Sequence, residues 1–262
     1  MNQTHLIRFF TLVVASLSFA VSATELVIAD KLQWTPLNPL RGDKSPQAAT
    51  LWGDPERKQS VATGFLVKFA DGFSSPPHIH NVTYRGVVIS GLVHNDDPTA
   101  AKMWMPQGSF WTQPAGESHI TAAKGSGNIA YIEIDQGPYL VKPVEEAFDK
   151  GERPVNVDVS NLVWVEFEPS TANVEIAYLW GSPSDSQVNG TMLRLPAGFN
   201  GSIQTDNELR SVVISGQITH RGKALSPGSY FGSATPTTYK LSAEQQSVVY
   251  LRSKGRYRIA NQ

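Results

Sequence analysis

The chain has 262 residues, and its 22 Lys and Arg side chains almost balance 23 Asp and Glu, which gives a formal net charge of −1. This balance excludes the basic surface of a nucleic-acid-binding protein and the polybasic face of a peripheral membrane protein. The chain contains no cysteine, so disulfides, thiol catalysis, zinc–thiolate sites and iron–sulfur clusters are excluded as well.

The N-terminal segment has the character of a secretory signal. His5 and Arg8 precede an apolar run over residues 9–20, and small residues follow at the positions that a signal peptidase reads, ending at Ala23. We therefore expect residues 1–23 to be a cleaved signal peptide and the protein to be periplasmic or secreted. An uncleaved anchor is the alternative, although the run is short for a membrane span.

The rest of the sequence contains an internal duplication. Five short segments recur in the same order, with offsets that fall from 130 to 120 residues. The matching pairs begin at Leu32 and Leu162, Leu51 and Leu179, Gly64 and Gly190, Arg85 and Arg210, and Gly108 and Gly228. Five collinear matches indicate one module used twice.

Each copy has the pattern of a β protein. Residues 131–135 alternate polar and apolar side chains, so we expect Glu133 and Asp135 on the solvated face of a strand. Turn residues recur about every ten positions, and one short helix is expected over 144–150. We predict an all-β protein with two tandem barrels, a first domain over 24–142, a linker over 143–156 and a second domain over 157–262.

A histidine pair is the first candidate metal-binding feature. His78 and His80 are two residues apart, a spacing that turns both imidazoles to one face of a strand. Tyr84, four residues after His80, points to the same face if the strand continues unbroken. The alternative is a pair of partly exposed strand histidines with no metal.

The spacing around this pair resembles both signature motifs of the cupin superfamily. Gly72, His78 and His80 are followed by Gly91 at the first motif's spacing; the second motif's spacing is matched by Gly108, Pro114, Gly116 and His119. The first copy therefore resembles a cupin, and through the repeat the chain resembles a bicupin of two jelly-roll barrels. The resemblance implies that His78, His80 and His119 bind one divalent metal ion.

The chain departs from the cupin pattern at two positions. Tyr84 stands where cupins usually place a glutamate ligand, and Ala123 stands where they have asparagine. The resulting neutral three-histidine site resembles the iron sites of some cupin dioxygenases. Imidazole also suits other metals, so Fe(II) is favoured and Zn, Mn, Ni or Cu are alternatives. Tyr84 and Glu117 are the candidate catalytic residues, with an inward-facing barrel aromatic and a solvated turn residue as their respective alternatives.

The second copy lacks these ligands, and we expect it to bind no metal and to stabilise the first copy by sheet packing, with binding of an organic ligand as the alternative. Alignment on Gly216 places hydrophobic or hydroxyl side chains at the equivalent positions: Ile203, Thr205, Leu209 and Tyr239. Among other candidates, His94 and His220 are expected to be surface or loop histidines. Three tryptophans are expected in the core, with a pocket wall as the alternative: Trp52, Trp104 and Trp111.

Together these observations predict an exported bicupin with one metal in its first barrel. The resemblance implies a metal-dependent, dioxygenase-like enzyme acting on a small anionic or enolisable compound. The competing hypothesis is a non-catalytic binding or sensing module, similar to the cupin domains of zinc-dependent anti-sigma factors. The expected partner is a small molecule, with no nucleic acid and no membrane after signal cleavage. Cupins are often dimers, so the resemblance is compatible with a homodimer, although the sequence itself does not specify the oligomeric state.

Overall fold

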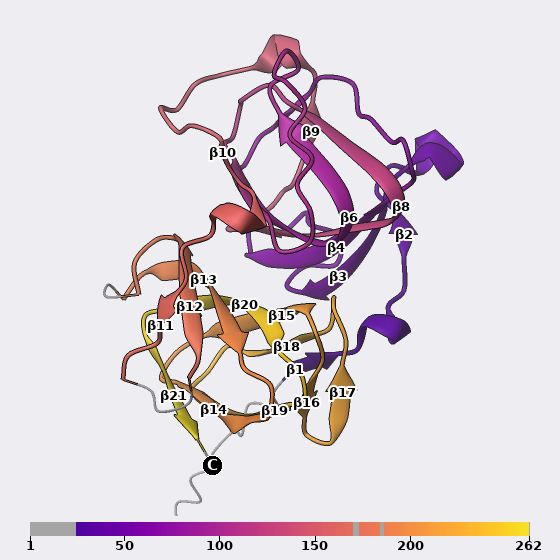
Figure 1. The fold of residues 1–262 in the computed structure, drawn as a ribbon. Helices are drawn as coiled ribbons and strands as arrows, with labels where there is room; N and C mark the ends of the chain where they lie inside the picture. The colour runs from indigo at the N-terminus through magenta and orange to yellow at the C-terminus, as the bar shows by residue number, and fades with distance from the viewer. Residues whose placement is uncertain (1–24, 170–172, 184–185, 262) are drawn as a thin grey trace, which may run out of the picture.

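The computed structural model describes residues 25–169, 173–183 and 186–261 of the chain. The predicted signal peptide therefore lies outside the described residues. Two β-barrels lie one above the other with their broad sheets facing, the first formed by the N-terminal half and the second by the C-terminal half (Figure 1). The predicted all-β architecture of two tandem barrels is confirmed.

The first barrel has one broad sheet and a smaller opposing wall. The sheet order is β10-β7-β6-β8-β4-β3-β2, and β5 pairs with β9 separately. The strands are β2 (Thr35–Pro36), β3 (Gln47–Trp52), β4 (Thr63–Phe69), β5 (Ile79–His80), β6 (Tyr84–Asp96), β7 (Phe110–Gln113), β8 (Ile120–Ile134) and β9 (Val141–Lys142).

Two long strands bend to close this barrel. β6 and β8 pair along most of their length, with register shifts between Val88 and Ser90 and between Ser90 and Leu92. At the bend, Gly91 has φ +75°, and a Cβ there would lie 2.1 Å from the side-chain oxygen of Asn128. Only glycine accepts both conditions. The bend turns the distal half of each strand over the barrel interior, where it meets the histidines.

The second barrel consists of two facing sheets. The first has the order β1-β18-β15-β20-β13-β12-β11 and the second has the order β17-β16-β19-β14-β21. The strands are β11 (Val165–Glu166), β12 (Glu175–Trp180), β13 (Val188–Leu195), β14 (Phe199–Thr205), β15 (Leu209–Ser215), β16 (Ile218–His220), β17 (Lys223–Leu225), β18 (Tyr230–Ser233), β19 (Thr237–Ala243), β20 (Ser247–Lys254) and β21 (Tyr257–Asn261).

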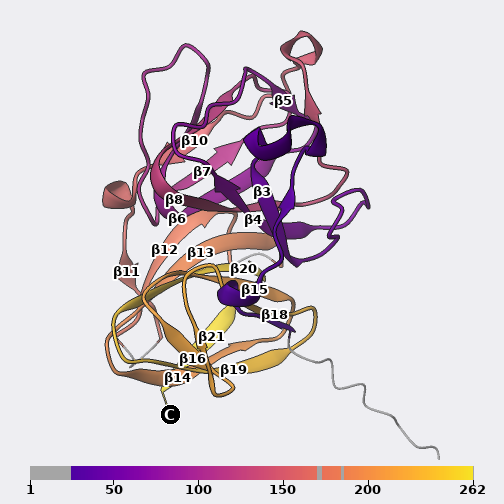
Figure 2. The same cartoon turned by 90° about the vertical axis from the view of Figure 1, so that its right-hand side faces the viewer.

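The two modules exchange one strand each. β1 (Glu25–Val27), which begins the first copy, pairs with β18 of the second barrel; β10 (Val155–Val157), which begins the second copy, pairs with β7 of the first. Figure 2 shows the N-terminal strand beside the C-terminal barrel. The exchange crosses both predicted boundaries, since 25–27 were assigned to the first domain and 155–156 to the linker. Each barrel is thus completed by the other half of the chain.

The broad sheets of the two barrels pack against each other around a shared hydrophobic core. That core combines residues of both halves, among them Leu66, Phe110 and Tyr131 from the first and Met192 and Tyr250 from the second. Most of its members are almost fully buried. Burial of this kind makes the interface a continuous core rather than a contact between independent domains.

A buried polar cluster lies at the centre of this interface. Glu133 is fully buried; its carboxylate accepts hydrogen bonds from Tyr131 (3.0 Å) and Tyr250 (2.8 Å) and lies 3.4 Å from the guanidinium of Arg252. The sequence-based expectation of a solvated Glu133 is wrong, because the outer face of its strand is covered by the second barrel. Asp135, which also pairs with Arg252 at 2.8 Å, is exposed as expected.

Equivalent residues of the two copies make equivalent contacts across the interface. The guanidinium of Arg85 lies 3.7 Å from the ring centroid of Trp180, and that of its repeat equivalent Arg210 lies 5.2 Å from that of Trp52. Glu133 occupies the repeat position of Arg252, so the two copies carry opposite charges at equivalent places. This asymmetry favours pairing between the two different copies over pairing of either copy with itself.

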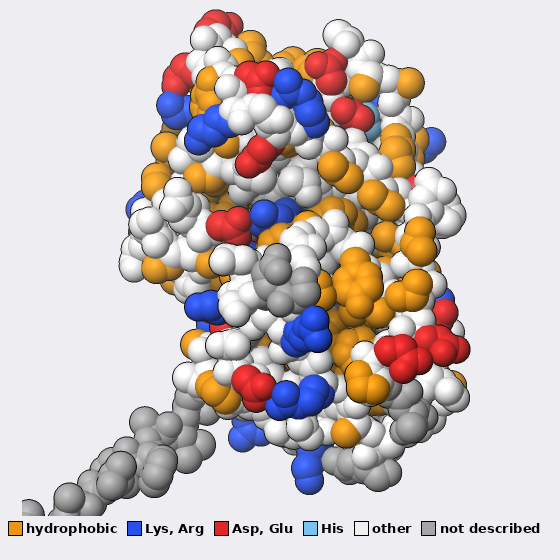
Figure 3. Space-filling model, turned by 90° about the vertical axis from the view of Figure 1, so that its left-hand side faces the viewer, with side chains coloured by type: hydrophobic (Ala, Val, Ile, Leu, Met, Phe, Trp, Pro, Cys, Tyr) orange, Lys and Arg blue, Asp and Glu red, His pale blue; other side chains and the backbone are white. Residues whose placement is uncertain are grey.

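Helices are few and short. The expected helix over 144–150 is instead one 3-10 turn, η3 (Val144–Glu146), which ends where Ala147 adopts an extended conformation. The others in the described part are η1 (Ala29–Lys31), η2 (Pro39–Lys44) and η4 (Val159–Asn161). None of the described helices has the length and apolar character of a membrane span. On the face seen in Figure 3, acidic and basic side chains are interspersed.

Candidate metal centre

Three histidines from two chain segments meet inside the first barrel. His78 and His80 flank Ile79 at β5, and His119 immediately precedes β8. The backbones of His78 and His119 exchange two hydrogen bonds, of 3.1 and 3.0 Å. One potential ligand nitrogen from each ring lies within 4.8 Å of the other two. The predicted convergence of these imidazoles on one point is present in the structure.

The other nitrogen of each ring is held by the backbone. The Nδ1 atom of His78 lies 3.0 Å from the carbonyl oxygen of Pro76, that of His80 lies 3.1 Å from Leu140 O, and that of His119 lies 3.1 Å from Glu117 O. Because a carbonyl only accepts, each Nδ1 carries the proton and donates it. Each Nε2 therefore carries a lone pair and no proton, which is the form that a metal ion binds.

Burial keeps these imidazoles neutral. His119 is fully buried and His80 nearly so, whereas His78 is partly exposed. Loss of hydration lowers the pKa of His119 to about 3, with the neighbouring His78 adding to the effect. The pKa of His80 falls well below its ordinary value for the same reasons. Protons therefore compete weakly with a metal ion at neutral pH.

Tyr84 lies beside the histidines although β5 and β6 are separate strands. Its hydroxyl oxygen is 3.3 Å from His119 Nε2 and 2.7 Å from Asn95 Oδ1. Burial raises its pKa, an effect that the nearby Trp111, Thr121 and Asn95 partly offset, so the phenol is protonated at neutral pH. The structure thus brings Tyr84 to the site, while its catalytic role stays a prediction.

Glu117 is placed differently. Its carboxylate is 3.3 Å from the guanidinium of Arg153 at the surface, and it is not among the described residues that line the cavity beside the histidines. Its backbone carbonyl, in contrast, accepts the Nδ1 proton of His119. The observed contribution of Glu117 to the site is therefore to orient a histidine, and a catalytic role for its carboxylate stays untested.

A cavity of about 290 Å³ lies in front of the histidines. Its wall is largely apolar and includes Phe65, Val67, Phe69, Phe73 and Ile132. The described polar residues that line it include both members of the histidine pair, two tyrosines, Thr121, Glu56 and two arginines, Arg41 and Arg57. An apolar cavity with a few polar groups is the usual form of a small-molecule site.

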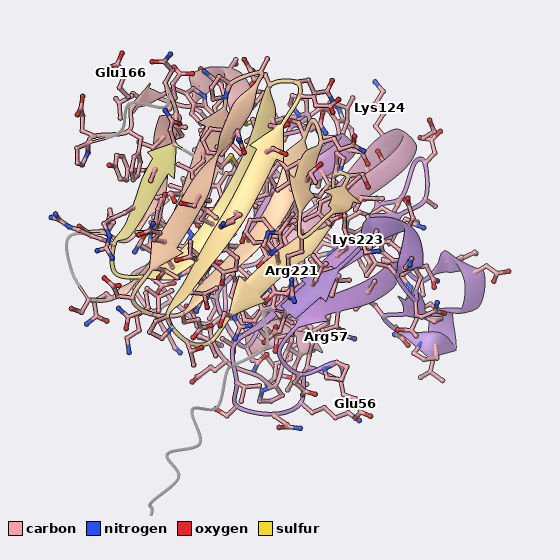
Figure 4. All side chains as sticks on the ribbon, turned by 90° about the horizontal axis from the view of Figure 1, so that it is seen from below. Glu56, Arg57, Lys124, Glu166, Arg221 and Lys223 are labelled. Carbon is pink, nitrogen blue, oxygen red and sulfur yellow. The ribbon has the colours of Figure 1, made fainter. Side chains whose placement is uncertain are left out.

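Arg57 brings a positive charge to this cavity. It lies on the loop between β3 and β4 (Figure 4), with its guanidinium 5.0 Å from the ring centroid of Phe65 and 3.3 Å from the hydroxyl oxygen of Thr50. No carboxylate in the described part of the chain is within ion-pair distance of it. The buried indole N–H of Trp111, which also lines the cavity, finds no acceptor among the described residues. Both groups can bind an acceptor on a ligand.

Asp54 holds the loop that carries Arg57. Its carboxylate accepts backbone N–H bonds from Glu56 (3.1 Å), Lys58 (2.6 Å) and Gln59 (2.8 Å). These bonds, that from Gln59 above all, lower the pKa of Asp54 below its ordinary value of 3.8. The carboxylate therefore contributes its stabilisation above that pH, and the contribution is lost as the pH falls through the lowered native pKa.

We expect Asp54→Ala to loosen this loop without unfolding either barrel. Amide hydrogen exchange should become faster at Glu56, Lys58 and Gln59, since these amides lose their acceptor, and stay unchanged in the strands. Wild-type protein should show the same local acceleration only in strong acid. Unchanged exchange at all three amides in Asp54→Ala would contradict this prediction.

The second barrel has no equivalent of this centre in the described residues. The backbone pairing of His78 with His119 corresponds to that of Ile203 with Tyr239, as expected from the repeat. The interior of this barrel is filled by a hydrophobic cluster that includes both of these residues. The second barrel therefore supports the first through their common interface.

The remaining candidates are not part of the centre. His94 and His220 are both buried, so their predicted surface location is wrong; the former packs near Trp104 and the latter lies in the second barrel. Trp52 belongs to the core between the barrels. Of the three tryptophans singled out, Trp111 alone is among the cavity-lining residues described.

Sequence analysis missed several residues at the centre. Tyr139 stacks on the His80 ring, with centroids 4.4 Å apart and planes 10° apart, and its hydroxyl oxygen is 3.3 Å from His80 Nε2. Asn95 and Gln113 form a buried chain behind Tyr84. No motif spacing marks these residues, because their contacts arise from the way the strands pack.

The residues fit a divalent metal ion. Three neutral imidazoles present lone pairs toward a common point, and the outer nitrogen of each is already bound to a carbonyl, as in protein metal sites generally. Three protein ligands leave positions open for other molecules, which is typical of catalytic rather than structural sites. The donor set does not choose among Fe, Zn, Cu and Ni.

Comparisons with known proteins agree with this fold. Three similar crystal structures are a candidate dioxygenase from Nostoc punctiforme (13% identity, TM-score 0.69, 90% of this chain and 84% of that one), salicylate 1,2-dioxygenase from Pseudoaminobacter salicylatoxidans with gentisate (14%, 0.59, 91% and 85%) and Ylba from E. coli (15%, 0.58, 90% and 94%). At these identities the likeness shows the fold alone, which is that of the cupins. No curated protein matches the sequence.

One family model covers nearly all of the described chain. It matches residues 25–260, which include both barrels, the exchanged strands and the three histidines. The chain has the cupin fold, with a three-histidine group in its first barrel, and it belongs to the family described as Domain of unknown function (DUF4437).

Proposed function

We propose that the protein is a metal-dependent, dioxygenase-like enzyme that uses Fe(II) to act on a small anionic or enolisable compound. The observation that carries this proposal is the group of three Nε2 lone pairs beside a largely apolar cavity. Salicylate 1,2-dioxygenase and a quercetin 2,3-dioxygenase from Acinetobacter baumannii have a similar fold and support the reaction class. The metal would supply the redox chemistry and a common binding point for substrate and dioxygen.

Residues around the cavity exclude water and bind the anionic part of the substrate. The apolar wall around Phe65 and Ile132 excludes water from the bound substrate, which strengthens electrostatic interactions inside the cavity. Arg57 attracts an anionic group of the substrate, and the free N–H of Trp111 can donate to one of its oxygens. The absence of a carboxylate ligand in the three-histidine group leaves the full charge of a divalent ion to attract an anion.

Oxygen consumption tests this function directly. Protein loaded anaerobically with Fe(II) should consume dioxygen when a substrate from a panel of β-diketones, thiols and hydroxy acids is added, and should not do so when loaded with Zn. If compounds of the panel bind stoichiometrically but no oxygen is consumed, the protein is a binding or sensing module and the proposed reaction is wrong.

We expect Arg57→Gln to weaken binding of anionic substrates. Loss of one charge-assisted hydrogen bond is worth about 1.5–3 kcal/mol, or roughly a 10- to 100-fold rise in KM with a smaller change in kcat. Arg41→Gln is the matched control, because Arg41 also lines the cavity but is exposed to solvent, where charge is screened. A KM that is unchanged in Arg57→Gln would contradict the assignment.

Export is a separate proposal and rests on the sequence of residues 1–23 alone. Cell fractionation and N-terminal sequencing of the purified protein test it, with a mature N-terminus after Ala23 as the expected result. We also propose a homodimer, which sedimentation of the purified protein tests.

A further inference from the structure

A chain of buried side-chain amides runs behind Tyr84. Gln113 Nε2 donates to the backbone carbonyl of Glu117 at 3.2 Å, and Asn95 Nδ2 donates to Gln113 Oε1 at 2.9 Å. At the other end, Asn95 Oδ1 accepts from the hydroxyls of Tyr84 and Thr121, each at 2.7 Å. Asn95 and Gln113 are both 1% exposed, so water cannot replace these partners.

The carbonyl of Glu117 fixes the direction of every bond in this chain. Because a carbonyl only accepts, the atom of Gln113 that faces it must be the NH₂ group, and the oxygen of Gln113 must then face Asn95. The atom of Asn95 that faces this oxygen must in turn be the NH₂ group of Asn95. The side-chain oxygen of Asn95 therefore faces the two hydroxyls. Both Tyr84 and Thr121 must therefore direct their protons at Asn95.

The hydroxyl oxygens keep their lone pairs for the cavity. Tyr84 and Thr121 both line it, and the Tyr84 oxygen is 3.3 Å from His119 Nε2. That nitrogen also presents a lone pair, since the proton of His119 is on Nδ1. An imidazole that binds a metal cannot accept a hydrogen bond, so in the metal-loaded protein Asn95 is the acceptor that remains for the Tyr84 proton.

We propose that Asn95 and Gln113 are positioning residues that make Tyr84 a hydrogen-bond acceptor toward the open position of the metal. This inference rests on the proposed metal centre and refines its substrate class. The group bound beside His119 should carry a proton that it donates to Tyr84, as water or an alcohol does. With Arg57 available for a carboxylate, the substrate that satisfies both is a small hydroxy acid. A proton-free anion such as azide has no proton to donate and is repelled by the lone pair of the Tyr84 oxygen.

Azide binding to the Co(II)-loaded protein tests this polarity. In Asn95→Leu the Tyr84 proton loses its acceptor and becomes free to point into the cavity, so azide affinity, read from the Co(II) absorption spectrum, should rise about tenfold or more. In a Tyr84→Phe/Thr121→Val background, which lacks both hydroxyls that donate to Asn95, the same substitution should change azide affinity less than about twofold. In the Thr121→Val background, where the Tyr84 hydroxyl still donates to Asn95, Asn95→Leu should again raise azide affinity about tenfold.

The outcomes separate this inference from the proposed function. If Asn95→Leu changes azide affinity by the same factor in the wild-type background and in the Tyr84→Phe/Thr121→Val background, Asn95 has a merely structural role and the inference is wrong, while the metal centre stands. If no Co(II) spectrum develops at all, the metal centre itself is wrong.

A second measurement needs no variant. Neutron diffraction from deuterated wild-type crystals, with or without zinc, should locate the Tyr84 hydroxyl deuterium on the line to Asn95 Oδ1. A deuterium directed at the cavity in the zinc-loaded protein would overturn the inference even if Asn95→Leu failed to fold.

Discussion

His119→Ala is expected to remove stoichiometric metal from the purified protein and to leave both barrels folded. His119 would supply one of three ligand nitrogens. Mutation of a residue that only hydrogen-bonds to a metal ligand lowers metal affinity by up to about 100-fold, so loss of the ligand itself should lower it by more than that. The barrels should persist because hydrophobic burial, not the ion, holds them together. Metal analysis and circular dichroism of the variant check both parts.

The matched control is His94→Ala. His94 is also buried in the first barrel but is outside the three-histidine group. This variant should keep its metal, whereas His80→Ala should lose it as His119→Ala does. Equal metal content in wild type, His80→Ala and His119→Ala would show that the ion binds elsewhere.

Glu133→Leu should destabilise the whole protein by about 3–5 kcal/mol, the usual cost of removing one partner from a buried ion pair. Glu133 is fully buried between the barrels, where it neutralises Arg252 and accepts hydrogen bonds from Tyr131 and Tyr250. Without it, the ion pair with the exposed Asp135 is the one that Arg252 retains among the described residues. Urea unfolding followed by fluorescence measures the loss.

Glu175→Leu provides the comparison for this experiment. Glu175 also pairs with an arginine, Arg194, at 2.7 Å, but this pair is partly exposed to solvent. Exposed pairs contribute about 0–1 kcal/mol, so the control should unfold near the wild-type midpoint. If both variants lose the same stability, the buried cluster does not hold the barrels together.

The local pattern of the sequence determined the duplication and the β class, and its resemblance to the cupin motifs identified the three histidines of the candidate centre. Strand periodicity and glycine-marked turns depend on neighbouring residues only, and the spacing from Gly72 to His119 is itself a local property of the first copy. The register of the second copy also followed from the repeat, since Ile203 pairs with Tyr239 as His78 pairs with His119.

Only the tertiary structure decided which strand faces are covered and which segments of the chain contact one another. Glu133 alternates with apolar neighbours as a solvated residue would, and it is buried because a second barrel covers its face. The exchange of β1 and β10 and the approach of Arg57 to the cavity join residues far apart in the sequence, and the amide chain from Tyr84 to Glu117 joins residues of β6 and β7 with the turn before β8. Such contacts depend on how whole sheets pack, which no local spacing encodes.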